Sequence, residues 1–219
     1  MVVSESSARR YTLRDPDVRL MLQVRDDSAA AFEELVLRYQ DRLVALLTHL
    51  SGSRDQAEDL AQEVFLRVYR ARKSYVPGAK FSTWLFTIAN NAASNALRTL
   101  ARRHEVRPEA RTGDSTVVNP MDHLAQASSS QMPVRRLAKA ETREIVRLAV
   151  ESLGERQRMA VLLSKFEGMC YAEIAEVMEL SPQAIKSLLA RARGNLREVL
   201  APYMERGEAP VVGKNENGE

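Results

Sequence analysis

The chain has 219 residues, of which 45% are hydrophobic and only 5% aromatic, and its formal net charge is +3. This length suggests one large domain or two small ones, and the abundance of Leu, Ala, Arg and Glu favours helices over strands. The one cysteine, Cys170, excludes an intrachain disulfide, and no Cys/His cluster has metal-ligand spacing. Neither a signal peptide nor a membrane span is recognisable, so we expect a cytoplasmic chain without direct membrane insertion.

Helical periodicity divides the chain into five segments. Residues 1–15 are polar and expected to be disordered, whereas residues 16–103 carry dense helical periodicity. Residues 104–135 contain three prolines, a serine run and mixed charge, which predicts a flexible linker. Residues 136–203 are helical again, and residues 204–219 form a polar tail that is expected to be disordered. The sequence therefore predicts an all-α fold of two small helical domains joined by a flexible linker.

The first predicted domain contains three long amphipathic helices. The first has apolar residues at three-and-four spacing between Phe32 and Leu47, and Gly52 suits its C-terminal cap. The second begins after Ser53 or Asp55, either of which can accept a backbone hydrogen bond as its N-cap. The third follows a Val-Pro-Gly turn at 76–78.

The second of these helices separates its charges along its length. Residues 55–63 carry four acids and no base, and residues 67–73 carry four bases and no acid. Complementarity to the helix macrodipole explains this pattern by itself. The alternative is an acidic face that docks on a protein, followed by a basic face that binds nucleic acid.

Aromatic residues, which are scarce in the chain, cluster at the next turn. The cluster consists of Tyr75, Phe81, Trp84 and Phe86. Core packing is expected for Trp84 and Phe86, whereas Tyr75 and Phe81 flank the turn and are candidates for stacking on unpaired bases. Positive charge for the phosphates is available nearby from Lys73, Lys80 and Arg98.

The second predicted domain ends in a helix-turn-helix pattern between Tyr171 and Glu198. Ala175 stands where the two helices would cross, and Ile185 stands where the second would pack back onto the first. Ser181 is the expected N-cap of the second helix, with Pro182 at its first position. Glu179 occupies the place of the usual turn glycine.

The second helix of this pair is strongly basic. It carries four bases, Lys186, Arg191, Arg193 and Arg197, against one acid. Residues near its start would face base edges in a major groove, and its arginines would neutralise phosphates. The alternative is an ordinary amphipathic hairpin with a solvated basic face.

Taken together, these motifs resemble a bacterial RNA polymerase sigma factor of the extracytoplasmic-function (ECF) group. The resemblance covers about residues 32–103 and 136–200. Its most specific parts are the blocks DLAQEVFLRVYR and FSTWLFTIA, followed in order by the helix-turn-helix. It implies a transcription initiation factor without enzymatic activity or cofactor, whose partners are core RNA polymerase, promoter DNA and an anti-sigma factor.

The resemblance also implies roles for individual residues. Polymerase docking would involve Asp55, Asp59, Gln62, Glu63 and Arg67. Opening and reading of the minus-ten element would involve Lys73, Tyr75, Lys80, Phe81, Asn91 and Arg98. Contacts with the minus-thirty-five element would involve Ser181, Gln183, Ala184, Lys186, Ser187, Arg191 and Arg193.

The sequence departs from the family pattern at three positions. Asn90 and Asn95 stand where the family often has arginine and aspartate, and Leu188 stands where it often has arginine. The bases that this chain would read are therefore not fixed by the resemblance. A stand-alone helix-turn-helix regulator, whose first domain senses a signal or dimerises, is the alternative function.

Overall fold

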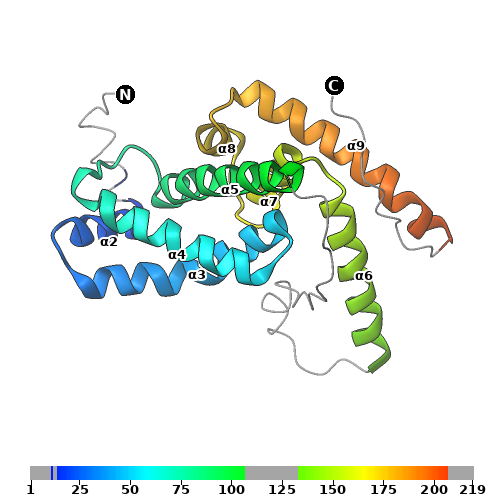
Figure 1. The fold of residues 1–219 in the computed structure, drawn as a ribbon, viewed down its shortest axis with the longest axis horizontal. Helices are drawn as coiled ribbons and strands as arrows, with labels where there is room; N and C mark the ends of the chain where they lie inside the picture. Colours follow the sequence, from blue (N-terminus) through cyan, green and yellow to red (C-terminus); the bar gives the residue numbers. More distant parts are fainter. Residues whose placement is uncertain (1–10, 12–13, 107–132, 207–219) are drawn as a thin grey trace. The chain divides into compact units, whose positions relative to one another are not determined.

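The computed structural model of the chain describes residues 11, 14–106 and 133–206 (Figure 1). Every regular element within these ranges is helical, which confirms the predicted all-α class. The first ten residues, most of the predicted linker and most of the predicted tail lie outside the described residues. None of the described helices has the length and apolar character that crossing a membrane requires.

The chain divides into two compact units. The division falls in the undescribed segment near residues 116 and 117, and residues 172–180 group with the first unit. The helices in chain order are α2 (Pro16–Arg25), α3 (Ala29–Ser51), α4 (Arg54–Ala71), η1 (Arg72–Ser74), α5 (Phe81–Val106), α6 (Pro133–Glu151), α7 (Glu155–Lys165), α8 (Tyr171–Met178) and α9 (Pro182–Arg206). The domain boundaries expected from the sequence remain predictions.

Helix α3 is the centre of the first unit and packs against α2, α4 and α5. Its stripe of Leu35, Leu43 and Leu47 is at most 1% exposed, because these residues recur on one face at helical spacing. Gly52 ends the helix in the left-handed conformation with φ 73°, as predicted for a C-terminal cap. Of the two predicted N-caps for α4, Ser53 is the one whose side chain accepts a backbone hydrogen bond, from Gln56.

One carboxylate joins the starts of two helices in this unit. Asp15 Oδ1 accepts a hydrogen bond of 2.9 Å from the backbone N–H of Asp17, and so caps α2. Asp15 Oδ2 accepts a second, of 3.0 Å, from the backbone N–H of Phe81 at the first residue of α5. Since the first N–H groups of a helix have no partner within it, Asp15 both stabilises α5 and fixes where it begins relative to α2.

The second unit is held together by α9, which packs against α6 and α7. Ile185, Leu189 and Ala192 form the buried stripe of α9, and the Asn195 side chain donates a 3.1 Å hydrogen bond to Gln157 of α7. Helix α9 extends to Arg206, about two turns beyond the end near residue 198 that the sequence predicts. Leu196, Val199 and Leu200 are only partly exposed, so the extra turns continue the apolar stripe despite Pro202.

Candidate nucleic-acid interface

The outer face of α4 carries most of the residues expected to dock on a protein. Asp55, Asp59 and Gln62 are exposed and lie on one side of the helix, opposite buried Ala61, Val64 and Val68. Glu63 and Arg67 are only partly exposed and form an ion pair with an Nε–Oε1 distance of 2.8 Å. The hydrogen bond from Arg67 lowers the pKa of the Glu63 carboxyl, so this residue stays charged at neutral pH.

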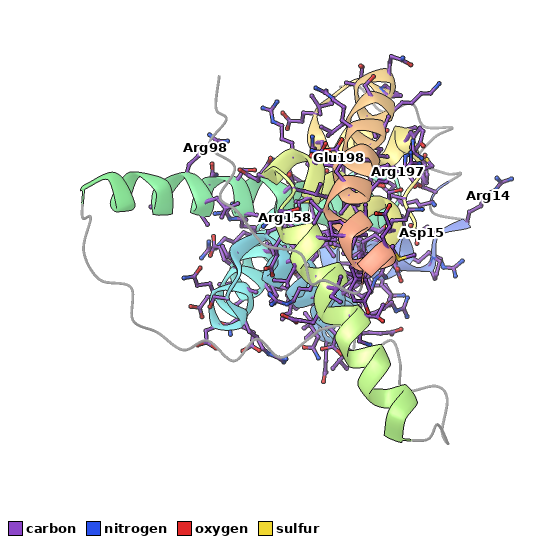
Figure 2. All side chains as sticks on the ribbon, turned by 90° about the vertical axis from the view of Figure 1, so that its right-hand side faces the viewer. Arg14, Asp15, Arg98, Arg158, Arg197 and Glu198 are labelled. Carbon is purple, nitrogen blue, oxygen red and sulfur yellow. The ribbon has the colours of Figure 1, made fainter. Side chains whose placement is uncertain are left out.

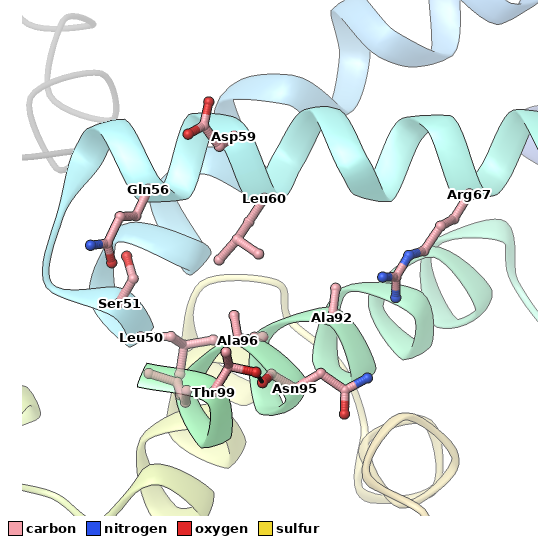
Figure 3. A pocket seen from close by; sticks show the side chains of 12 residues that line it. Leu50, Ser51, Gln56, Asp59, Leu60, Arg67, Ala92, Asn95, Ala96 and Thr99 are labelled. Atoms are coloured by element: carbon pink, nitrogen blue, oxygen red, sulfur yellow. Dashed lines mark hydrogen bonds between the residues drawn. The ribbon is translucent and has the colours of Figure 1, made fainter. Parts of the chain in front are cut away.

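The Arg67 side chain lies on the side of α4 that faces α5 (Figure 3). Leu60 and Arg67 point from α4 toward α5, whereas the Asp59 carboxylate points away from it (Figure 3). Asp59, Leu60 and Arg67 of α4 line a cavity of about 470 Å³, together with Ala92 and Asn95 of α5. The Arg67 side chain is therefore turned away from the outer face of α4, whereas Asp59 belongs to that face and also borders the cavity (Figure 3).

Two exposed leucines were missed by reasoning from charge alone. Leu66 is 50% exposed and lies one turn beyond Gln62, between the acids at the start of α4 and Arg70 at its end. Leu37 of α3 is 63% exposed. Leu66 could have been found in the sequence, because it is a large apolar residue that falls outside the buried stripe of its helix. Single exposed leucines are common on protein surfaces, so the position of Leu66 in line with Asp55, Asp59 and Gln62 is what makes it a candidate docking residue.

The rings of Tyr75 and Phe81 are not exposed for stacking on bases. Tyr75 is 4% exposed and packs at 4.8 Å against the partly exposed ring of Trp84. Phe81 is 1% exposed and packs edge-on at 5.3 Å against Tyr39. The expectation that these two rings stack on unpaired bases is therefore wrong for this conformation, because both rings are buried in the core beneath the turn. Val76, at 59% exposure, is the exposed apolar residue of this turn.

The Tyr75 hydroxyl group is buried and has no hydrogen-bond partner among the described residues. Burial raises the pKa of this phenol well above its usual range, so it stays neutral. Replacing Tyr75 with phenylalanine should raise the free energy of unfolding by about 1 kcal/mol, because an unsatisfied buried hydroxyl costs its desolvation. Urea denaturation would measure the change, and a loss of stability of similar size would show that the hydroxyl does have a partner.

The three cations and the one asparagine predicted to contact the minus-ten element differ in their surroundings. Lys80, Asn91 and Arg98 are exposed, Lys80 Nζ lies 2.7 Å from Glu173 Oε1, and Arg98 projects from α5 (Figure 2). Lys73 is also exposed, but its ammonium group donates hydrogen bonds to the carboxylate of Asp27 and to the backbone carbonyl of Arg25. Lys73 therefore has two acceptors within the protein, which the sequence does not indicate.

The turn before α9 has the predicted caps. The Ser181 hydroxyl accepts a 3.1 Å hydrogen bond from the backbone N–H of Ala184, and Pro182 is the first helical residue. Glu179 adopts φ 54°, the left-handed conformation that the usual turn glycine would adopt without strain. The backbone N–H of Leu180 bonds to the carbonyl of Ala175, which closes the turn. Glu179 therefore closes the turn in a left-handed conformation that is strained for a residue other than glycine.

The side of α9 opposite its buried stripe is the candidate DNA-reading face. Its exposed members near the start are Ser181, Gln183, Lys186, Ser187, Arg191 and Arg193, whereas Ala184 is partly exposed. At about 100° per residue, Gln183 and Ser187 lie at the centre of this face. Lys186 and Arg193 lie on one flank and Arg191 on the other, so positive charge borders a polar strip on both sides. Arg197 and Glu198 follow further along α9 (Figure 2).

Within the described part of the chain, no group of three or more His, Cys, Asp or Glu side chains is placed to hold a metal ion. The surfaces found here offer charge, hydrogen bonding and one exposed leucine on α4. Groups of these kinds are the ones that proteins use for docking and for contacts with phosphates and bases.

Two family models match the chain, one in each half. Sigma-70 region 2 matches residues 35–103, and Sigma-70, region 4 matches residues 143–196. The RNA polymerase sigma-H factor of Pseudomonas aeruginosa is 31% identical over 192 residues, which span 87% of this chain and 97% of that protein. The ECF RNA polymerase sigma-E factor of Escherichia coli is 32% identical over 190 residues, with the same coverage.

Solved structures show a similar fold. The sigma factor RpoE of Bartonella quintana, in complex with the anti-sigma factor NepR, is 25% identical with a TM-score of 0.61, covering 78% of this chain and 96% of that one. CnrH, in complex with the cytosolic domain of CnrY, is 22% identical with a TM-score of 0.60. The match covers 85% of this chain and 98% of CnrH.

Proposed function

Because this chain belongs to the sigma-70 family, in its ECF group, we propose that its three surfaces divide promoter recognition between them. The outer face of α4 docks on core RNA polymerase, the turn at 75–80 with the start of α5 opens and reads the minus-ten element, and the exposed face of α9 reads the minus-thirty-five element. The chain has no reaction of its own in this scheme and acts in the cytoplasm, where polymerase and DNA meet.

The observation that carries the proposal is the exposed side of α9. The buried stripe of Ile185, Leu189 and Ala192 fixes the orientation of the helix in its unit and leaves the polar and basic residues in solvent. A helix of this kind places short polar side chains at base edges and its flanking cations at phosphates. Three residues differ from the family pattern on these surfaces. Asn90 and Asn95 lie on α5, and Leu188, which is partly exposed on α9, supplies no phosphate contact.

The test of this function begins with the purified chain and core polymerase. A co-eluting complex and transcription from a cognate promoter are expected, and mapping transcript starts after overexpression would yield both promoter elements. A stand-alone regulator would instead bind duplex DNA tightly without polymerase. No complex at moderate salt, together with tight duplex binding by the chain alone, would contradict the proposed function.

We further propose that an anti-sigma factor controls this chain. The support is the similarity to RpoE, whose structure is a complex with the anti-sigma factor NepR. Such a partner would cover the α4 face or the α9 face and so compete with polymerase or DNA. Affinity capture of the tagged chain from cells before and after the inducing signal would test this. The expected result is one protein that is bound to the chain before the signal and released after it.

The flanking arginines of α9 should each contribute to the salt dependence of promoter binding. Binding of the holoenzyme to promoter DNA is expected to weaken as salt rises, and the slope is that of the logarithm of the binding constant against the logarithm of the salt concentration. Replacing Arg193 or Arg191 with alanine should reduce the steepness of this slope by about 0.9, since each phosphate contact releases counterions. Fluorescence anisotropy with a labelled promoter duplex would measure the slope between low and moderate salt. Glu198→Ala is the matched control on the same helix, and an unchanged slope in an arginine variant would remove that residue from the interface.

A further inference from the structure

The fold places an acid inside the basic segment of the first unit. In the sequence, residues 67–73 carry four bases and no acid. In the structure, Asp27 from the turn between α2 and α3 lies against η1, where Lys73 Nζ is 2.5 Å from its Oδ2 and Arg72 Nε is 3.2 Å from its Oδ1. Both oxygens of the carboxylate are therefore paired with cations about 45 residues away along the chain.

Asp27 occupies this position with a backbone conformation that few side chains adopt. Its φ is 67°, in the left-handed region that favours glycine and, among other residues, asparagine and aspartate. The hydrogen bonds from Lys73 and then from Arg72 hold the pKa of Asp27 below its usual range, so the carboxylate is charged at neutral pH. Asp27 thus keeps a strained backbone conformation while its carboxylate pairs directly with Lys73 and Arg72.

The two cations are held to different degrees. The Arg72 guanidinium lies 3.9 Å from the centre of the Tyr69 ring and also donates to the Tyr69 carbonyl, and its side chain is only 21% exposed. The Lys73 side chain is 57% exposed, and its other acceptor is the Arg25 carbonyl at the end of α2. Exposed ion pairs are weak, so a phosphate group can compete for Lys73 but not readily for Arg72.

We propose that Asp27 is an internal competitor for DNA phosphate, which holds the Lys73 ammonium and so sets how strongly the first unit binds the promoter. The proposal rests on the proposed function, because Lys73 lies two residues before the turn that is assigned to the minus-ten element. In the wild-type complex Lys73 stays paired with Asp27 and makes no phosphate contact. Non-specific binding is weakened in this way, while contacts elsewhere on the promoter are left unchanged.

The experiment removes the negative charge of residue 27 and keeps its left-handed backbone conformation. In Asp27→Asn, the new side chain tolerates the same left-handed conformation but attracts Lys73 less strongly. The holoenzyme with this variant should bind a labelled promoter fragment severalfold more tightly at low salt. Its log–log salt slope should be steeper by about 0.7 for an opened strand or about 0.9 for a duplex, the contribution of one phosphate contact.

Two further variants make the result specific. Asp26→Asn changes the net charge equally, but Asp26 pairs with Arg25 at 3.7 Å rather than with η1, so the wild-type slope is expected. Adding Lys73→Met to Asp27→Asn should restore the wild-type slope, because the released ammonium is then absent. Should the asparagine variant fold poorly, Asp27→Gly replaces it, since glycine adopts φ 67° without strain.

An unchanged slope in Asp27→Asn, or a steeper slope that survives Lys73→Met, would overturn the proposal. Weaker binding with a lower free energy of unfolding would show that the Asp27 pair only stabilises the fold. Failure of the proposed function would be visible earlier, since the wild-type chain would then form no holoenzyme with promoter preference.

Discussion

Replacing Leu66 with aspartate is expected to weaken binding of core polymerase at least about thirtyfold, or about 2 kcal/mol, the level at which an interface residue counts as a hot spot. Leu66 is half exposed in the free chain and lies in line with Asp55, Asp59 and Arg70 along the outer face of α4. Docking would bury its side chain, and a carboxylate at that position would instead be buried without a partner. The measurement is competition with the labelled wild-type chain for core polymerase.

The matched control for this variant is Met204→Asp. Met204 is 80% exposed on α9, in the other unit, so the same acidic group is added away from the proposed docking face. Wild-type affinity is expected there. Equal affinities of the Leu66 and Met204 variants would show that the outer face of α4 does not bind polymerase. Far-UV circular dichroism should be unchanged for both variants, because neither side chain belongs to the core.

Phe81→Ala should lower the free energy of unfolding of the first unit by about 3–5 kcal/mol, the usual cost of removing a fully buried phenylalanine. The ring is 1% exposed and packs against Tyr39 at 5.3 Å and Trp84 at 6.0 Å, so its removal leaves a cavity at the start of α5. Trp84 is the one tryptophan of the chain and a neighbour of this ring. Its fluorescence during urea denaturation therefore reports on this unit.

Val76→Ala is the control for the phenylalanine variant. Val76 lies in the same turn but is 59% exposed, so its truncation should change stability by no more than about 0.5 kcal/mol. A loss below about 1 kcal/mol for Phe81→Ala would mean that the ring is not part of a tightly packed core. Promoter opening should also decline in Phe81→Ala at temperatures where the first unit is still folded, since α5 then starts from a less well-defined position.

Local features of the structure were largely predictable from the sequence. The left-handed cap at Gly52, the Ser53 cap of α4 and the Ser181–Pro182 start of α9 were all identified from residue type and position. They were predictable because a cap or an apolar stripe depends on residues within one or two turns of the helix. The family resemblance has the same origin, since its motifs are short blocks in a fixed order.

The sequence by itself thus determined the all-α class, the local caps and the family, although it missed α2 and placed the end of α9 about two turns too early. The tertiary structure decided which functional side chains are available. Packing buried Tyr75 and Phe81, turned Arg67 toward α5 and left Leu66 in solvent. It also brought Asp27 to Lys73 across 46 residues and Asp15 to Phe81 across 66. The physical reason is that exposure and long-range pairing depend on how separate helices pack, which no local spacing of residue types contains.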